Sequence, residues 1–174
     1  SSKKKYISAS TRESTLEIGG GYGGLARIHK LLHPCMNYTI IDLPVSLFFA
    51  YVFLAMNFPD ARIKWLDSDQ PGNLELYDFV LVPVQLCEGL KGKRFDRVLN
   101  TGSLQEMPDL TVDFWMSFIQ ESIDIEMFYS FNYFLNDNNL HTSFDQGRMN
   151  LICPKPDSFW KVWHFEINPS VINK

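Results

Sequence analysis

The run LEIGGGYGGL at residues 16–25 has the residue types and spacing most suited to ligand binding. Glycine lets the backbone turn tightly and lets a ligand approach the main chain closely. A glycine loop between a strand and a helix also offers the free N–H groups of the helix N-terminus. We therefore expect this loop to hold a polar ligand at the carboxyl edge of a sheet.

Two acidic residues bear on the class of ligand. Gly19, Gly21 and Gly24 satisfy G-x-G-x-x-G, the pattern of dinucleotide binding. Glu17 precedes them, however, and we expect its carboxylate to face the ligand, where it would repel a pyrophosphate. S-adenosylmethionine carries a sulfonium and an ammonium, so its charge matches this carboxylate. Asp42 ends the next predicted strand, where a carboxylate accepts both ribose hydroxyls of either cofactor or caps the following helix.

Three runs together resemble class I S-adenosylmethionine-dependent methyltransferases. They are EIGGGYGG at residues 17–24, IIDLP at 40–44 and FDRVLNTGSLQEMP at 95–108. More narrowly, they resemble the sugar O-methyltransferase family, to which the runs SFDQGR at 143–148 and HFEINP at 164–169 are also similar. The resemblance extends from residue 15 to the end of the chain, and it implies methyl transfer from S-adenosylmethionine to a hydroxyl of a polysaccharide or glycosylated metabolite.

The resemblance also implies roles for particular residues. It places Glu17 and the glycines near the methionine end of the cofactor, Asp42 at the ribose and Gln85 near the adenine. The complete predicted cofactor set is Glu17, Gly19, Gly20, Gly21, Gly23, Asp42, Leu43, Gln85, Asn100 and Thr101. The segment from Asn100 to Met107 follows a strand at the point where the methyl group meets its acceptor.

A sugar hydroxyl needs a base to remove its proton. The candidates are Glu106, after the strand that ends near Thr101, and His141 and Asp145 on a later polar loop. We predict no metal site. His29 and His33 share a helix face but have no acidic partner between them, so we expect them to face the negative end of the helix dipole.

The elements that must position these residues alternate along the chain. Apolar runs predict strands, and a 3.6-residue period or a helix-starting proline predicts helices. The strands are expected at 15–18, 38–42, 78–84, 95–101 and 127–131, with helices at 22–32 and 45–57 and a third capped by Asp109 or Thr111 that buries Phe114, Trp115, Phe118, Ile119 and Ile123. We expect Pro83 to limit how centrally its strand can pair.

This order predicts an α/β fold, a Rossmann-like three-layer αβα sandwich with a mostly parallel sheet. Strands at 148–153 and 159–167 would add an antiparallel strand near the C-terminus. Residues 1–14 would form an N-terminal tail and residues 15–174 the S-adenosylmethionine-binding methyltransferase domain. Compared with the family, the helical segment that usually precedes the first strand is nearly absent.

Composition narrows the class of protein further. The chain has 174 residues, 45% hydrophobic and 21% charged, which is typical of one globular domain. A net charge of -4 argues against nucleic acid as a partner. The apolar stretch from Pro44 to Phe58 is too short for membrane insertion. Three widely spaced cysteines without a C-x-x-C pair favour a cytoplasmic location.

The helix expected at 45–57 is apolar on almost every side between Val45 and Met56. Such a helix needs cover all round, so we expect a homodimer or a missing N-terminal segment to cover it. Two other functions stay open at this point. One is an NAD-dependent oxidoreductase, against which Glu17 argues. The other is a non-catalytic Rossmann-like binding domain that docks a partner through this helix.

Overall fold

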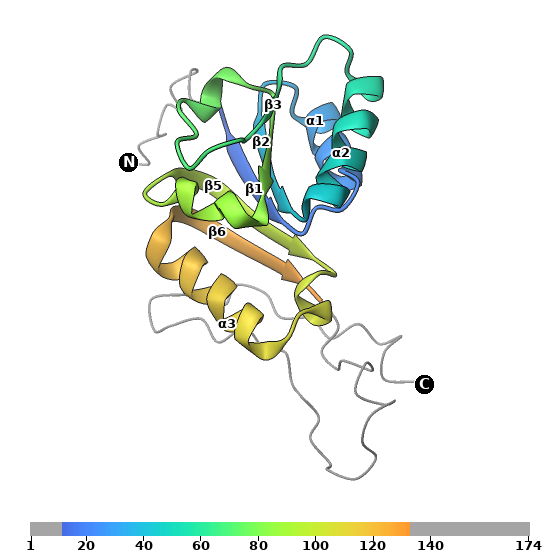
Figure 1. Ribbon diagram of the computed structural model, residues 1–174. Helices are drawn as coiled ribbons and strands as arrows, with labels where there is room; N and C mark the ends of the chain where they lie inside the picture. Colours follow the sequence, from blue (N-terminus) through green and yellow to red (C-terminus); the bar gives the residue numbers. More distant parts are fainter. Residues whose placement is uncertain (1–11, 133–174) are drawn as a thin grey trace, which may run out of the picture.

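Six parallel strands form one sheet in the computed structural model, which describes residues 12–132 (Figure 1). The order across the sheet is β3-β4-β2-β1-β5-β6, and every pairing between neighbours is parallel. The strands are β1 (Ser14–Ile18), β2 (Asn37–Asp42), β3 (Ile63–Trp65), β4 (Phe79–Pro83), β5 (Arg94–Thr101) and β6 (Asp124–Phe131).

Helices cover both faces of this sheet. The helices are α1 (Gly24–Leu32), α2 (Pro44–Asn57) and α3 (Asp109–Ser117), with short 3-10 turns at Leu74–Leu76, Val84–Leu90 and Leu104–Glu106 and a π-helical turn at Phe118–Ser122. Helices α1 and α2 lie on one face, while α3 and its π-helical turn lie on the other (Figure 1). The predicted three-layer αβα arrangement is therefore confirmed.

Two apolar clusters, one on each face, explain why the central strands read as continuous apolar runs. In β4, Val80 and Val82 belong to the cluster on the same face as α3, while Phe79 and Leu81 belong to the cluster on the face of α2. The same alternation in β1 directs Leu16 and Ile18 toward the α3 layer. It therefore turns Glu17, which stands between them, toward the layer of α1 and α2.

The sheet differs from the sequence prediction in three respects. A short strand, β3, was missed because its three residues are too few to show a period. Strand β4 pairs with β3 on one side and β2 on the other. Pro83 is the last residue of β4, so it does not prevent this strand from pairing inside the sheet. No antiparallel strand occurs within residues 12–132, and the segments 148–153 and 159–167 lie outside the described residues.

The helix starts are confirmed in one case and corrected in another. Pro44 is the first residue of α2, as expected from its fixed φ. Neither Asp109 nor Thr111 caps α3; the N-cap is Pro108, whose extended backbone leads directly into the helix. Of the residues expected inside, Trp115, Phe118, Ile119 and Ile123 are buried, whereas Phe114 is 42% exposed.

Helices α1 and α2 leave much apolar surface exposed. In α1, the buried residues are Ala26 and Lys30, while Ile28, Leu31 and Leu32 are exposed. In α2, the buried residues are Leu47, Ala50 and Leu54, and no described residue covers the opposite side, which includes Phe48 and Phe49. No helix in the described range is long and apolar enough to cross a membrane.

Candidate functional site

The glycine loop joins β1 to α1 at the carboxyl edge of the sheet, as predicted. Gly19, Gly21 and Gly23 have φ values of 74°, 56° and 85°, which favour glycine. A Cβ on Gly19 would lie 2.1 Å from the Ser103 Oγ, and one on Gly20 would lie 2.7 Å from the Ile40 Cγ2. A Cβ on Gly21 would meet no atom within 4 Å, so this part of the loop is open to a ligand.

Asp42 lies directly beside the open part of the loop. Its Oδ2 accepts a hydrogen bond of 2.7 Å from the Gly21 N–H, and its Oδ1 accepts one of 2.6 Å from the Leu43 N–H. A carboxylate oxygen can accept more than one hydrogen bond, so both oxygens keep capacity for a ligand. The structure thus brings together the loop and the acid that the sequence placed on separate strands.

Glu17 lies under the loop, with only 1% of its surface exposed. Its Oε2 accepts a hydrogen bond of 2.9 Å from the Tyr38 hydroxyl, and the same oxygen would lie 2.8 Å from a Cβ on Gly20. Burial, aided by the charge of Asp42, raises the pKa of Glu17 to about 7, although the Tyr38 hydrogen bond opposes the rise. The carboxylate therefore supports the loop from below, and the loop presents bare backbone at Gly21 beside the exposed ring of Tyr22.

A buried amide network holds the adjoining strand ends. Asn100 is completely buried, and its Nδ2 donates to the Ile18 carbonyl at 2.9 Å and to the Ser103 Oγ at 2.6 Å. The Asn132 Nδ2 donates to the Asn100 Oδ1 at 2.8 Å. These contacts fasten the ends of β1, β5 and β6 together, so Asn100 shapes the base of the loop.

Sequence reasoning missed Tyr38, Ser103 and Asn132. Ser103 lies inside the NTGSLQE run, and the signal available was its spacing of three from Asn100, which allows the hydrogen bond between their side chains. Tyr38 and Asn132 gave no such local signal, because their partners Glu17 and Asn100 are far away in the sequence.

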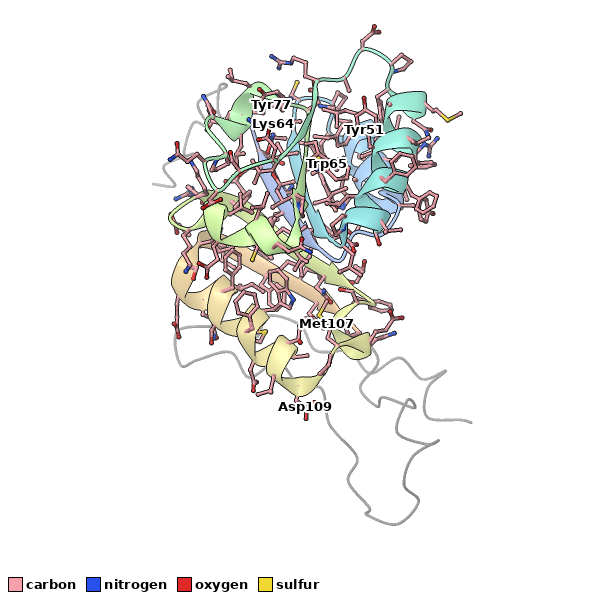
Figure 2. The ribbon with its side chains drawn as sticks, viewed as in Figure 1. Tyr51, Lys64, Trp65, Tyr77, Met107 and Asp109 are labelled. Atoms are coloured by element: carbon pink, nitrogen blue, oxygen red, sulfur yellow. The ribbon has the colours of Figure 1, made fainter. Side chains whose placement is uncertain are left out.

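The remaining predicted residues are spread along the same edge. Leu43 and Gln85 are exposed, and Thr101 is half-buried at the end of β5. Glu106 is exposed in the turn Leu104–Glu106. It immediately precedes Met107, which Figure 2 labels together with Asp109, the first residue of α3. His141 and Asp145 lie outside the described residues. No cluster of three or more His, Cys, Asp or Glu side chains suited to a metal occurs within residues 12–132.

The comparisons with known proteins bear on this arrangement. No family model and no curated protein sequence matches the chain. A solved structure of the mitomycin 7-O-methyltransferase MmcR superimposes with a TM-score of 0.53 at 15% identity, covering 71% of this chain and 32% of MmcR. Over this part, the chain shares the α/β Rossmann-like fold of that methyltransferase. The chain therefore spans about a third of the length of that methyltransferase.

Two further structures are less similar. The pyocyanin biosynthetic protein PhzM has a TM-score of 0.47 at 13% identity, covering 70% of this chain and 33% of its own. The apo form of the S-adenosylmethionine-dependent methyltransferase SibL has a TM-score of 0.45 at 16% identity, covering 67% and 30%. The likeness of fold described for this chain therefore rests on MmcR.

Proposed function

We propose that this chain binds S-adenosylmethionine and takes part in methyl transfer. The observation that carries the proposal is the bare backbone at Gly21, which lies hydrogen-bonded to Asp42 and has no atom where a Cβ would sit. The predicted cofactor residues include two carboxylates, Glu17 and Asp42, and no basic side chain. That composition suits a cationic ligand better than the pyrophosphate of NAD.

The residues present fit this cofactor. Asp42 would accept the ribose hydroxyls, the loop from Gly19 to Gly23 would lie against the methionine part, and Leu43 and Gln85 would border the adenine. Glu17 would act from beneath, because its negative charge favours a cation above the loop. When bound, S-adenosylmethionine supplies an activated methyl group. The backbone of the glycine loop and Asp42 would orient this methyl group. Methyl transfer is a direct displacement, and correct orientation of the reactants is the main way in which a protein accelerates it.

The acceptor in this proposal is a hydroxyl, and the family resemblance favours a sugar. Glu106 follows β5 on the carboxyl edge of the sheet and is exposed, so its carboxylate is free to take the proton of an acceptor hydroxyl. His141 and Asp145 remain alternative bases from the sequence alone. MmcR is named as a methyltransferase acting at an oxygen, which agrees with a hydroxyl acceptor.

Calorimetry with S-adenosylhomocysteine and with NAD separates the two cofactors. We expect the chain to bind S-adenosylhomocysteine and not NAD. The matched variant is Asp42→Asn, which keeps the side-chain size but loses the charge and one acceptor. Its affinity for S-adenosylhomocysteine should fall by about 2 kcal/mol. Binding of NAD alone would overturn the proposal, and an unchanged affinity in the variant would remove Asp42 from the site.

Turnover with a panel of glycoside acceptors tests Glu106. The substitution Glu106→Gln should lower the methyl-transfer rate about a hundredfold, since a general base typically contributes 10²–10⁴. Affinity for S-adenosylhomocysteine should not change, because Glu106 is not among the residues assigned to the cofactor. Full turnover in this variant would show that a residue other than Glu106 acts as the general base.

The exposed side of α2 favours a second candidate function, a non-catalytic binding domain. Phe48 and Phe49 are both 58% exposed, and their rings contact each other at 5.8 Å between centroids. A patch of this kind is typical of a protein-binding surface. Cofactor binding without methylation of any acceptor in a broad screen would favour this second function over an enzyme.

A further inference from the structure

An open groove of about 500 Å³ lies on the α1 side of the sheet, over strands β5 and β6. Helix α1 forms one wall through Leu25, His29 and His33. The floor comes from alternate residues of the two strands, which point to the same face of a sheet. The volume falls within the range of small-molecule sites in proteins.

The floor of the groove is apolar and aromatic. Leu99 lies at its centre on β5 and is 5% exposed, while Met127, Tyr129 and Phe131 of β6 are 45–55% exposed. Leu99 lies opposite Tyr129, and Thr101 lies opposite Phe131, in the register of β5 and β6. This surface offers an apolar molecule a continuous contact area within the described part of the chain.

One end of the groove is basic. Arg97, His29 and His33 all line it. The Arg97 Nη2 pairs with the Glu13 Oε2 at 2.9 Å, which leaves other N–H donors of the guanidinium for a ligand. The His29 Nδ1 is buried and has no hydrogen-bond partner among the described residues. Burial, with the charges of Arg97 and His33, lowers the pKa of His29, so these groups repel a further positive charge at this end.

We propose that this groove binds a small anionic amphiphile, with its carboxylate, phosphate or sulfate group at Arg97 and its apolar body over Leu99 and Tyr129. The anion would accept hydrogen bonds from the N–H donors of Arg97 that its pair with Glu13 leaves available. From Arg97 to Thr101 the strand advances about 13 Å, the length available to the apolar body. A purely apolar occupant would leave the basic end unused. The inference does not depend on the cofactor assigned above.

A pair of fluorescent probes tests the charge requirement on the full chain. Anilinonaphthalene sulfonate carries an anionic group on an aromatic body, and N-phenyl-naphthylamine has the same body without the charge. We expect the sulfonate to bind in the groove. Arg97→Gln should lower the affinity for the sulfonate about tenfold, because a hydrogen bond to a charged group contributes about that much. The neutral probe should bind more weakly than the sulfonate and be unaffected by the variant.

Methyl NMR of the methionines locates the probe. The Met127 methyl lies in the groove, and Met56 lies on exposed α2, so the two distinguish the groove from the other apolar surface. We expect the sulfonate to shift the Met127 resonance, assigned with Met127→Leu, and leave Met56 unchanged. A shift at Met56 alone would overturn the proposal, as would equal affinity for both probes, which would indicate an apolar docking face.

A second variant guards against misfolding of Arg97→Gln. His33 is exposed at the C-cap of α1, so His33→Gln should fold normally. This variant should lower the affinity for the sulfonate two- to threefold, roughly the effect of losing one partly solvated hydrogen bond. As a control, Phe48→Ser on α2 should leave the Met127 shift unchanged. Full sulfonate affinity in both basic-end variants would contradict the inference.

Discussion

Glu17 is the residue whose surroundings most change its chemistry. Its carboxylate lies under the glycine loop, bonded to the Tyr38 hydroxyl and close to Asp42. Burial also raises the pKa of Tyr38, so Tyr38 remains the hydrogen donor of the pair. The pair holds a group that titrates near neutral pH directly beneath the proposed cofactor site.

This burial predicts a pH-dependent stability. The pKa of Glu17 rises from 4.5 in the unfolded chain to about 7 in the fold, so between these values the folded state keeps a proton that the unfolded state releases. The free energy of unfolding should therefore fall as pH rises from 4.5 to 7. Glu17→Gln should be more stable than the natural chain at pH 8, by on the order of 3 kcal/mol.

Urea unfolding at low and high pH measures this difference. Near pH 4 the two chains should have similar free energies of unfolding, because Glu17 is then protonated in both states. Gln can still accept the Tyr38 hydrogen bond, so the variant isolates the effect of charge. Parallel pH profiles for the two chains would show that Glu17 does not titrate as described.

Asp78 predicts the opposite pH effect at the amino edge of the sheet. Its carboxylate accepts from the Lys30 Nζ at 2.9 Å, from the Arg62 N–H at 2.9 Å and from the Arg12 guanidinium. Burial alone would raise the pKa of Asp78, but the Arg62 N–H and the charges of Lys30 and Arg12 lower it to about 2. The stabilisation should be present above pH 3.8 and be lost as pH falls through 2.

Asp78→Asn should therefore lower the free energy of unfolding at pH 7 by about 2 kcal/mol, because it leaves the buried Lys30 without its counter-charge. The difference from the natural chain should shrink as pH falls toward 2. Chemical denaturation at several pH values measures both effects. A difference that stays constant down to the acid limit would contradict this account.

Among the elements, α2 divides sharply into a buried and an exposed side. Leu54 is fully buried and packs next to the glycine loop, where a Cβ on Gly23 would lie 3.3 Å from its side chain. Phe48 lies on the other side of the helix and is 58% exposed. The helix thus anchors the loop with one side and presents an apolar surface with the other.

This division predicts unequal costs for substitutions within one helix. Leu54→Ala should lower the free energy of unfolding by about 3 kcal/mol, because it removes buried methyl groups and leaves a cavity. Phe48→Ser, the matched control, should change it by less than about 0.5 kcal/mol. Thermal and urea unfolding measure both. Similar costs for the two variants would mean that the outer side of α2 is covered in solution.

At the scale of the whole molecule, the sheet order places β1, β2 and β5 side by side and their carboxyl ends at one edge. The proposed cofactor, bound at this edge, would stabilise the folded chain by mass action. S-adenosylhomocysteine at a hundred times its Kd should raise the free energy of unfolding by about 2.7 kcal/mol, whereas NAD should have no effect. A thermal-shift titration measures this, and Asp42→Asn should reduce it at the same ligand concentration.

The sequence alone determined the features that are local in the chain. The strand–loop–helix unit around residues 16–25, the start of α2 at Pro44 and the layered architecture follow from glycine chemistry, proline geometry and alternating periods. Asp42 was likewise recognisable, because it ends an apolar run and precedes a helix-starting proline. Interactions between residues that are close in the sequence determine these features, so the sequence pattern predicts them directly.

Only the tertiary structure decided which polar groups lie inside. Glu17 was expected to face the ligand, yet its placement under the loop depends on Tyr38, a residue of another strand. Asn100 is buried because three strand ends converge on it, and the basic groove exists because β5 and β6 lie beside α1. Residues far apart in the chain determine burial and pairing of this kind, and no local period encodes them.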